Sequence, residues 1–354
     1  MSLLTPGGKF GDFDVVRELG RGGMGAVYLV RDPETGEEYA AKVMLESPSF
    51  RDDLKRRFIR EAETAMKIIH PNLVRVYDVG RDPETGYAYM IMDFIGGGDL
   101  HDELGRRLIE RHPYSVKDAL AVLRPILGAL SAAWAAGVVH RDIKPDNILF
   151  DREGTPYLGD LGVAKLAEDK TLTRLTMSNV VVGTPAYMAP EQMLDSHEVD
   201  VRADLYSLGV VFWEMLAGEC PNAGLSTSAL MARALSGTRL RDIRTFRPKL
   251  PHYVVHFLRR LTDPKPERRF ATPDEALAYL DEWRLREARL LRKILVLIVS
   301  VTALVIAAIL FVGVRWIAAP ASVAARPTVA ASADPEQAAD EDGQSEFSIP
   351  DSIR

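Results

Sequence analysis

The chain has 354 residues, of which 47% are hydrophobic and 27% are charged, and its formal net charge at pH 7 is −6. This composition excludes a mainly disordered chain and a collagen-like repeat. Cys220 is the one cysteine, which excludes an intrachain disulfide and favours a reducing compartment. The acidic balance argues against a broad nucleic-acid-binding surface, which needs a basic face, so no nucleic acid partner is expected.

Strand-like runs follow an N-terminal extension of residues 1–11. Alternating apolar side chains predict strands at 13–19, 26–31, 37–44 and 87–92. Residues 51–69 instead carry apolar side chains at helical spacing as far as Ile69, and His70-Pro71-Asn72 ends that helix. From about residue 99 onward, most apolar residues recur at helical spacing. The pattern predicts an α+β fold with a β-rich lobe at about 12–93 and an α-helical lobe at about 99–283.

The glycine-rich stretch 20–27 fits the pattern G-x-G-x-x-G-x-V through Gly20, Gly22, Gly25 and Val27. Dinucleotide-binding loops share this glycine spacing, and Glu38 lies near the position of their ribose-binding acid. Those loops open a helix, however, whereas residues 26–31 are strand-like. A loop between two strands indicates a flap whose backbone N–H groups cover the phosphates of ATP.

Lys42 lies on the next predicted strand, 17 residues after Gly25, where a lysine can reach the α- and β-phosphates as a point charge. Glu61 on the predicted helix can hold Lys42 through an ion pair. Glu63 is the competing residue. The spacing to Ala65 and to the His-Pro stop favours Glu61.

A hexapeptide, Arg-Asp-Pro-Glu-Thr-Gly, occurs twice, at 31–36 and at 81–86. The residues that flank the two copies differ, so a solenoid of repeats is not indicated. Asp-Pro and Thr-Gly are residue pairs typical of turns. We therefore predict two hairpin turns, each between strands.

The most specific motif is residues 140–147, His-Arg-Asp-Ile-Lys-Pro-Asp-Asn. In this motif Asp142 would accept or orient a hydroxyl proton, and Lys144 would offset charge on a transferring phosphoryl group. Asn147 would hold Mg²⁺ together with Asp160, which opens Asp160-Leu-Gly162 thirteen residues later. Asp and Asn supply the oxygen ligands that Mg²⁺ prefers.

Residues 183–191 read Gly-Thr-Pro-Ala-Tyr-Met-Ala-Pro-Glu, and Asp204-Leu-Tyr-Ser-Leu-Gly209 and Arg269 follow. With these motifs in order, residues 12–283 resemble the eukaryotic-like protein kinases. In particular they resemble the bacterial, membrane-anchored serine/threonine kinases. The resemblance implies a two-lobed kinase fold with ATP bound in the cleft.

The resemblance also implies site residues. ATP would contact Val27, Ala40 and Lys42, together with a hinge formed by Met92, Asp93 and Ile95. Lys144 and Thr184 resemble the residues of Ser/Thr rather than Tyr kinases. By the family pattern Glu191 pairs with Arg269, and Asp204 anchors the catalytic loop.

Control by phosphorylation is a further implication. In this family, an arginine at the position of Arg141 pairs with a phosphorylated residue of the activation loop. The candidates are Thr171, Thr173, Thr176 and Ser178. We expect autophosphorylation in trans, for which two copies would meet as a homodimer.

Two other functions share this fold. A pseudokinase scaffold is disfavoured because the five residues expected to carry the chemistry are all present, namely Lys42, Glu61, Asp142, Asn147 and Asp160. A small-molecule phosphotransferase is disfavoured because such enzymes lack the segment found here at 183–191. The sequence favours ATP- and Mg²⁺-dependent transfer to Ser/Thr hydroxyls of proteins.

An uncharged apolar run occupies residues 294–314. As a helix it would be about 31 Å long at ~1.5 Å per residue, which matches a hydrocarbon core of ~30 Å. The basic segment 284–293 precedes it, and only Arg315 follows closely. The positive-inside rule then predicts one membrane span with residues 1–293 in the cytoplasm. The outer tail, 315–354, carries three arginines and seven acidic residues, and its composition predicts disorder.

Overall fold

The computed structural model describes residues 4–22, 25–44, 52–83, 85–161, 185–194 and 199–317. Within these ranges only the backbone is described for residues 52–57, 61, 284, 287, 288, 291 and 311–317. The chain divides into two units, Met1–Leu290 and Leu291–Arg354.

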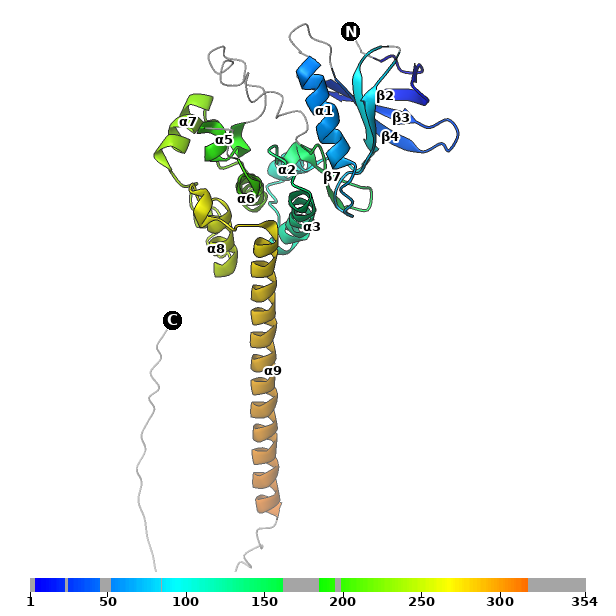
Figure 1. Cartoon of the computed structure of the whole chain (residues 1–354). Coiled ribbons are helices and arrows are strands. Elements are labelled where there is room, and N and C mark those ends of the chain that lie inside the picture. The colour runs from blue at the N-terminus through cyan, green and yellow to red at the C-terminus, as the bar shows by residue number, and fades with distance from the viewer. Residues whose placement is uncertain are drawn as a thin grey trace, which may run out of the picture. The chain divides into compact units, whose positions relative to one another are not determined.

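The first lobe of the unit Met1–Leu290 is a six-stranded antiparallel sheet beside one helix (Figure 1). The strands lie in the order β1-β2-β3-β4-β6-β5. Their bounds are β1 Lys9–Phe10, β2 Phe13–Arg21, β3 Gly25–Arg31, β4 Glu38–Met44, β5 Val76–Arg81 and β6 Ala88–Asp93. The four predicted strands are therefore present, and β1 and β5 add to them.

Both copies of the hexapeptide form the predicted turn. In the first copy the N–H of Asp32 donates to Glu37 O (2.9 Å), and the N–H of Gly36 donates to Asp32 O (2.8 Å). Asp82 and Gly86 make the same two bonds in the second copy, at the same lengths. The turns connect β3 to β4 and β5 to β6, which are neighbouring antiparallel strands. The same hexapeptide therefore forms the same pair of backbone hydrogen bonds at two places in one sheet.

Helix α1 (Asp52–Ala65) is shorter than predicted. It buries Phe58, Ala62 and Ala65. After the helix, Ile68 and not Ile69 is the isoleucine that packs in the core. Ile69 is 73% exposed. The α-helical pattern gives way after Ala65 to tighter turns such as Ile68 N–H to Ala65 O (3.0 Å), because the His70-Pro71 pair that follows disfavours helical backbone.

The second lobe is helical and is built around α6 (Val201–Ala217), most of whose residues are buried. Apolar residues occur on all sides of α6, and a helix of this kind is stable only where it is buried in a core. The elements are α2 Leu100–Ile109, α3 Val116–Ala135, η1 Pro145–Asn147, β7 Ile148–Phe150, β8 Pro156–Leu158, η3 Pro185–Tyr187, α5 Pro190–Leu194, α6 Val201–Ala217, α7 Thr227–Ser236, η4 Ile243–Thr245, α8 His252–Leu261, η5 Pro266–Arg268 and α9 Pro273–Ile317.

Helix α9 packs on this lobe through its first turns. Ser131 on α3 donates to Asp274 (2.6 Å), Arg124 pairs with Asp281, and the Trp283 ring stacks on Tyr253 of α8 with centroids 5.7 Å apart. These contacts join the beginning of α9 to both α3 and α8.

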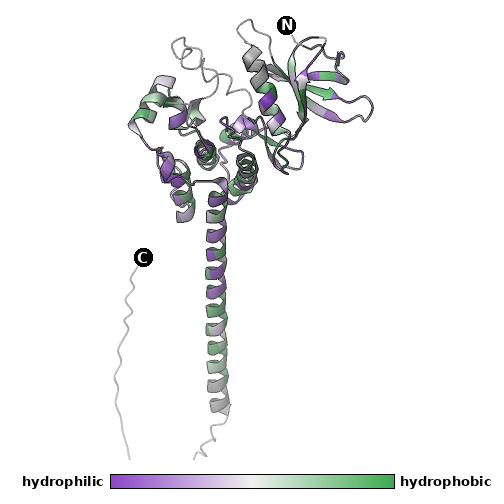
Figure 2. Cartoon of the chain, viewed as in Figure 1, coloured by the Kyte–Doolittle hydropathy of each residue, from purple (hydrophilic) through white to green (hydrophobic). Residues whose placement is uncertain are grey.

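Two described helices are long and apolar enough to cross a membrane. One is α3, with a mean hydropathy of 1.3, but 44% of it is buried in the helical lobe. The other is the part of α9 at Arg292–Leu310, with a mean hydropathy of 2.8 and no buried residues. Figure 2 shows the apolar residues along this part of α9.

Candidate active site

The sheet register places four predicted site residues on one face. Val27 pairs directly with Lys42, and Ala40 pairs directly with Met92. Because side chains alternate along a strand, Ala40 and Lys42 point to the same side of β4. Leu4, Phe10 and other apolar residues cover the opposite side of the sheet. The face with Lys42 is therefore the side that remains for a ligand.

The glycine-rich turn joins β2 to β3, as predicted, although Gly23 and Met24 lie outside the described residues. A Cβ atom on Gly25 would lie 2.4 Å from Val43 O, so this position requires glycine. At Gly20 and Gly22 a Cβ atom would meet nothing within 4 Å. These two glycines leave space along the turn that a phosphate group can approach.

Lys42 forms an ion pair with Asp160, which brings together residues 118 positions apart. The Lys42 side chain is 14% exposed and that of Asp160 is 40% exposed. Asp160 has a φ of 49°, in the left-handed region that non-glycine residues rarely occupy. The side chain of Glu61, the predicted partner of Lys42, lies outside the described residues; its backbone belongs to α1.

Asp93 and Ile95 lie at the end of β6, where the chain passes from one lobe to the other. The Asp93 carboxylate accepts from Tyr77 Oη (2.7 Å) and from the N–H of Arg75 (3.0 Å), and the N–H of Asp93 donates to Arg75 O (3.0 Å). The Asp93 carboxylate therefore raises the pKa of Tyr77 to about 12, mainly through this hydrogen bond.

Asp142, Lys144 and Asn147 come together in the loop before β7. Asn147 Nδ2 donates to Asp142 O (2.7 Å) and to Asp142 Oδ2 (3.2 Å). Lys144 Nζ lies 3.8 Å from Asp142 Oδ2. One short loop thus presents a carboxylate that is oriented by an amide and accompanied by an ammonium group.

The donor set fits a magnesium ion. Both hydrogen bonds of the Asn147 side chain use Nδ2, so its Oδ1 is the atom available to a cation. Asp160 adds a partly exposed carboxylate. The described residues contain no cluster of three or more His, Cys, Asp or Glu side chains. Two protein oxygens with phosphate and water completing the shell is the usual arrangement for Mg²⁺.

Buried polar groups hold the loop of residues 140–147 in place. The Asp204 carboxylate on α6, 1% exposed, accepts from the N–H groups of His140 and Arg141 at 2.7 Å each, which confirms its predicted anchoring role. Burial raises the pKa of Asp204, while these hydrogen bonds act in the opposite direction. His140 Nε2 donates to Gly159 O (2.9 Å), and this bond links the loop to the residue before Asp160.

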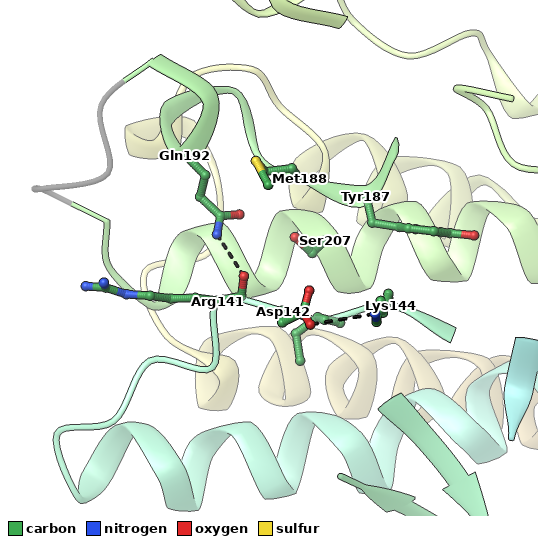
Figure 3. Close-up of a pocket in the computed structure, with 8 residues that line it drawn as sticks. Arg141, Asp142, Lys144, Tyr187, Met188, Gln192 and Ser207 are labelled. Atoms are coloured by element: carbon green, nitrogen blue, oxygen red, sulfur yellow. Dashed lines mark hydrogen bonds and ion pairs between the residues drawn. The ribbon is translucent and has the colours of Figure 1, made fainter. Parts of the chain in front are cut away.

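A pocket lies directly beside Asp142 (Figure 3). Residues 141–144 of the loop line one side, and Tyr187, Met188, Gln192 and Ser207 complete it. Gln192 Nε2 donates to Arg141 O (3.0 Å), while the Arg141 side chain points away from the pocket. Gln192 and Ser207 are not among the predicted site residues, since neither has a characteristic spacing from the catalytic loop.

The segment around the pocket is fixed to α6 and to η5. Tyr187 Oη donates to Glu214 (2.7 Å), and burial raises the pKa of both groups. Glu191 receives Arg269 Nη2 at 2.8 Å and also pairs with Nη1. The predicted pair of Glu191 with Arg269 is confirmed. The predicted regulatory residues Thr171, Thr173, Thr176 and Ser178, and the predicted substrate-loop residue Thr184, lie outside the described residues.

A β-rich lobe and a helical lobe that together present a Lys-Asp pair and an Asp-Lys-Asn loop define the class of ATP-dependent protein kinases. The chain belongs to the protein kinase family, because residues 13–279 match the model of the protein kinase domain. This confirms the two-lobed kinase fold that the motifs predicted.

The relatives are bacterial serine/threonine-protein kinases. The chain is 37% identical to PknE of Mycobacterium bovis over 75% of this chain and 45% of PknE. It is 31% identical to PrkC of Bacillus subtilis over 79% of this chain and 42% of PrkC. It therefore spans less than half the length of these two relatives. The crystal structure of the PknI kinase domain of Mycobacterium tuberculosis matches 79% of this chain and 99% of its own, with 28% identity and a TM-score of 0.62.

Proposed function

We propose that this protein transfers the γ-phosphoryl group of ATP, with Mg²⁺, to serine or threonine hydroxyls of proteins. The observation that carries the proposal is the assembly of Asp142, Lys144 and Asn147 in one loop, with a small pocket beside Asp142. Membership of the protein kinase family and similarity to named serine/threonine kinases support it.

Each residue has a definite part in this proposal. Asp142 accepts a hydrogen bond from the substrate hydroxyl and orients it, and Asn147 Nδ2 fixes the carboxylate for that task. Lys144 offsets negative charge that develops near Asp142. Asn147 Oδ1 and Asp160 would hold Mg²⁺, which supplies charge neutralisation on the phosphates. Lys42 would bind the phosphates from the sheet side.

The nucleotide would lie between the glycine-rich turn and the hinge. Gly20, Gly22 and Gly25 allow backbone N–H groups to approach phosphates.

Val27 and Ala40 share the face that carries Lys42, and they offer apolar contacts to a purine. The carbonyl of Asp93 and the backbone of Ile95 supply hydrogen bonds at the hinge, with Met92 beside them.

We also propose that the kinase is regulated by autophosphorylation in trans within residues 171–178. A phosphate there would add about −1.5 to −2 charges and could order the segment against Arg141. Thr184 would contribute to the choice of Ser/Thr acceptors.

A membrane anchor completes the proposal. The span is 294–314, with the kinase domain in the cytoplasm and the acidic tail outside. The hydroxyls of Ser300 and Thr302 donate to Val296 O and Ile298 O of their own helix, each at 2.8 Å. Their polar atoms are satisfied within the helix, as a lipid-facing segment requires.

The chemical proposal is tested with the full-length chain in detergent, γ-labelled ATP, Mg²⁺ and a mixture of unstructured acceptor proteins. We expect label on phosphoserine and phosphothreonine after acid hydrolysis, and none when EDTA replaces Mg²⁺. Label found only on phosphotyrosine or only on small molecules would contradict the proposed acceptor class. ATP binding without any transfer would indicate a pseudokinase.

A further inference from the structure

We propose that Tyr28 is a positioning residue for the glycine-rich turn, because its hydroxyl ties the turn to the N-terminal segment 4–10. The inference rests on the proposed binding of ATP at that turn. Tyr28 lies on β3, three residues after Gly25, and is 0% exposed. It points to the side of the sheet opposite Lys42, so it cannot touch the nucleotide directly.

The N-terminal segment is an integral part of the sheet. Leu4 and Phe10 are 5% and 4% exposed, and they pack in the same cluster as Tyr28. The N–H of Gly7 donates to Val15 O (2.8 Å), and the N–H of Val15 donates to Gly8 O (2.9 Å). The segment is therefore fastened to the strand that leads into the glycine-rich turn.

The Tyr28 hydroxyl receives hydrogen bonds from both sides. The N–H of Leu4 donates to it at 3.2 Å, and Arg21 Nη2 donates to it at 3.5 Å. Arg21 is the residue between Gly20 and Gly22. One oxygen atom thus connects the N-terminal segment to a side chain within the turn.

Glu18 fixes the same arginine. Its two carboxylate oxygens receive Arg21 Nε (3.0 Å) and Nη2 (2.7 Å), and Glu18 is the direct cross-strand partner of Tyr28. The N–H of Gly22 donates to Gly25 O (2.9 Å), which closes the turn one residue further on. The guanidinium of Arg21 is held on the outer face of the sheet, and the turn begins from a restrained strand end.

A restrained turn binds ATP more tightly, because less conformational entropy is lost when the phosphates are enclosed. Removing the Tyr28 hydroxyl should therefore weaken nucleotide binding with little change in the chemical step. We expect Tyr28→Phe to raise the KM for ATP about three- to tenfold, the usual effect of one lost hydrogen bond, with kcat within about twofold.

Tyr89→Phe is the matched control. Tyr89 lies on the same side of the sheet and its ring also packs on Phe10 (centroids 5.4 Å), a contact that phenylalanine keeps, but its hydroxyl donates to Asp78 of β5 (2.8 Å) and not to the glycine-rich turn. An equal rise in KM for both variants, or no rise for Tyr28→Phe, would overturn the proposal. A double variant of Tyr28→Phe with Arg21→Ala tests whether Tyr28 acts through Arg21. Tyr28→Phe should raise the KM for ATP by a smaller factor when Arg21 is absent.

Hydrogen exchange on the full chain gives a readout that does not need activity. In the wild type, a non-hydrolysable ATP analogue with Mg²⁺ should slow exchange in residues 20–27 and also in residues 4–10, because coupling between two regions is reciprocal. In Tyr28→Phe the protection of 4–10 should be lost while that of 20–27 remains. Protection of 20–27 alone in the wild type would refute this inference. Absence of protection at 20–27 would instead refute the proposed nucleotide site.

Discussion

Asp204 illustrates how much a single buried side chain contributes to the candidate active site. Its carboxylate accepts two backbone N–H groups of the catalytic loop and has almost no contact with solvent. An asparagine has the same shape but presents one acceptor and one donor. The N–H that faces the new amide nitrogen would be left without an acceptor.

We expect Asp204→Asn to lower the free energy of unfolding by about 1–3 kcal/mol, which is the range for an unsatisfied buried donor. Urea titration followed by circular dichroism measures this. Asp118→Asn, an exposed first-turn carboxylate of α3 that accepts from the N-cap hydroxyl of Ser115 (2.7 Å), is the control and should lower stability by less than about 1 kcal/mol. Equal stabilities of the two variants would contradict the anchoring role.

Asp242 gives the protein a defined pH dependence. Hydrogen bonds from the Arg244 side chain and backbone and from Arg259 lower the pKa of Asp242 from 3.8 to about 2. A carboxylate with a lowered pKa in the folded state stabilises that state above its unfolded pKa. The stabilisation is lost as the pH falls from 3.8 through about 2.

Between pH 4 and pH 2 the wild type should therefore lose more stability than Asp242→Asn. The effect is small, since the Asp242 side chain is 34% exposed. Denaturant titrations of both proteins at several pH values measure the difference. Parallel pH profiles would show that these hydrogen bonds do not stabilise the fold.

At the scale of elements, the ion pair of Arg269 with Glu191 joins α5 to the end of η5. The Arg269 side chain is 0% exposed, and its Nη1 also donates to Arg202 O (2.8 Å) on α6. Breaking a buried pair from one side leaves an uncompensated charge. The pair therefore holds the segment that lines the pocket against the core of the lobe.

Arg269→Met should destabilise the helical lobe by about 3–5 kcal/mol, the range for one removed partner of a buried pair. The neighbouring Arg268 is exposed, and Arg268→Met should have nearly no effect. Thermal unfolding of both variants compares them directly. Similar melting temperatures for the two would contradict the structural importance of the pair.

The elements also show what the sequence could predict. Strand alternation, glycine spacing and turn residues are local signals, and they located the sheet, both hairpin turns and the catalytic loop. The end of α1 depended on a competition between helix propensity and the residue before Pro71, and the pattern overestimated the helix. The contacts of Tyr28 with Leu4, of Gln192 with Arg141 and of Glu214 with Tyr187 join segments distant in sequence, and no local sequence pattern predicts such contacts.

In the molecule as a whole, the net charge and the hydropathy differ between the kinase domain, the apolar span and the C-terminal tail. Residues 315–354 have a net charge of −4, from three arginines and seven acidic residues. The apolar span is uncharged, so the remaining −2 of the total −6 belongs to residues 1–293. The overall acidity consequently says little about the surface that meets protein substrates.

The proposed anchor predicts where the protein is found. The full chain should remain with membranes after washing at high pH, whereas a chain ending at residue 290 should be soluble and still folded, because 1–290 forms a unit of its own. Fractionation followed by immunoblotting measures this. A soluble full-length chain would rule out the span at 294–314.

Asp142 is the residue proposed to direct phosphoryl transfer from ATP to a protein hydroxyl. The most direct measurement compares transfer from γ-labelled ATP by the full-length wild type, Asp142→Asn and Asp118→Asn, with unfolding curves recorded for all three. We predict that Asp142→Asn lowers kcat at least about a hundredfold while remaining folded, and that Asp118→Asn transfers phosphate at the wild-type rate. Wild-type activity in a folded Asp142→Asn would contradict the proposed role of Asp142.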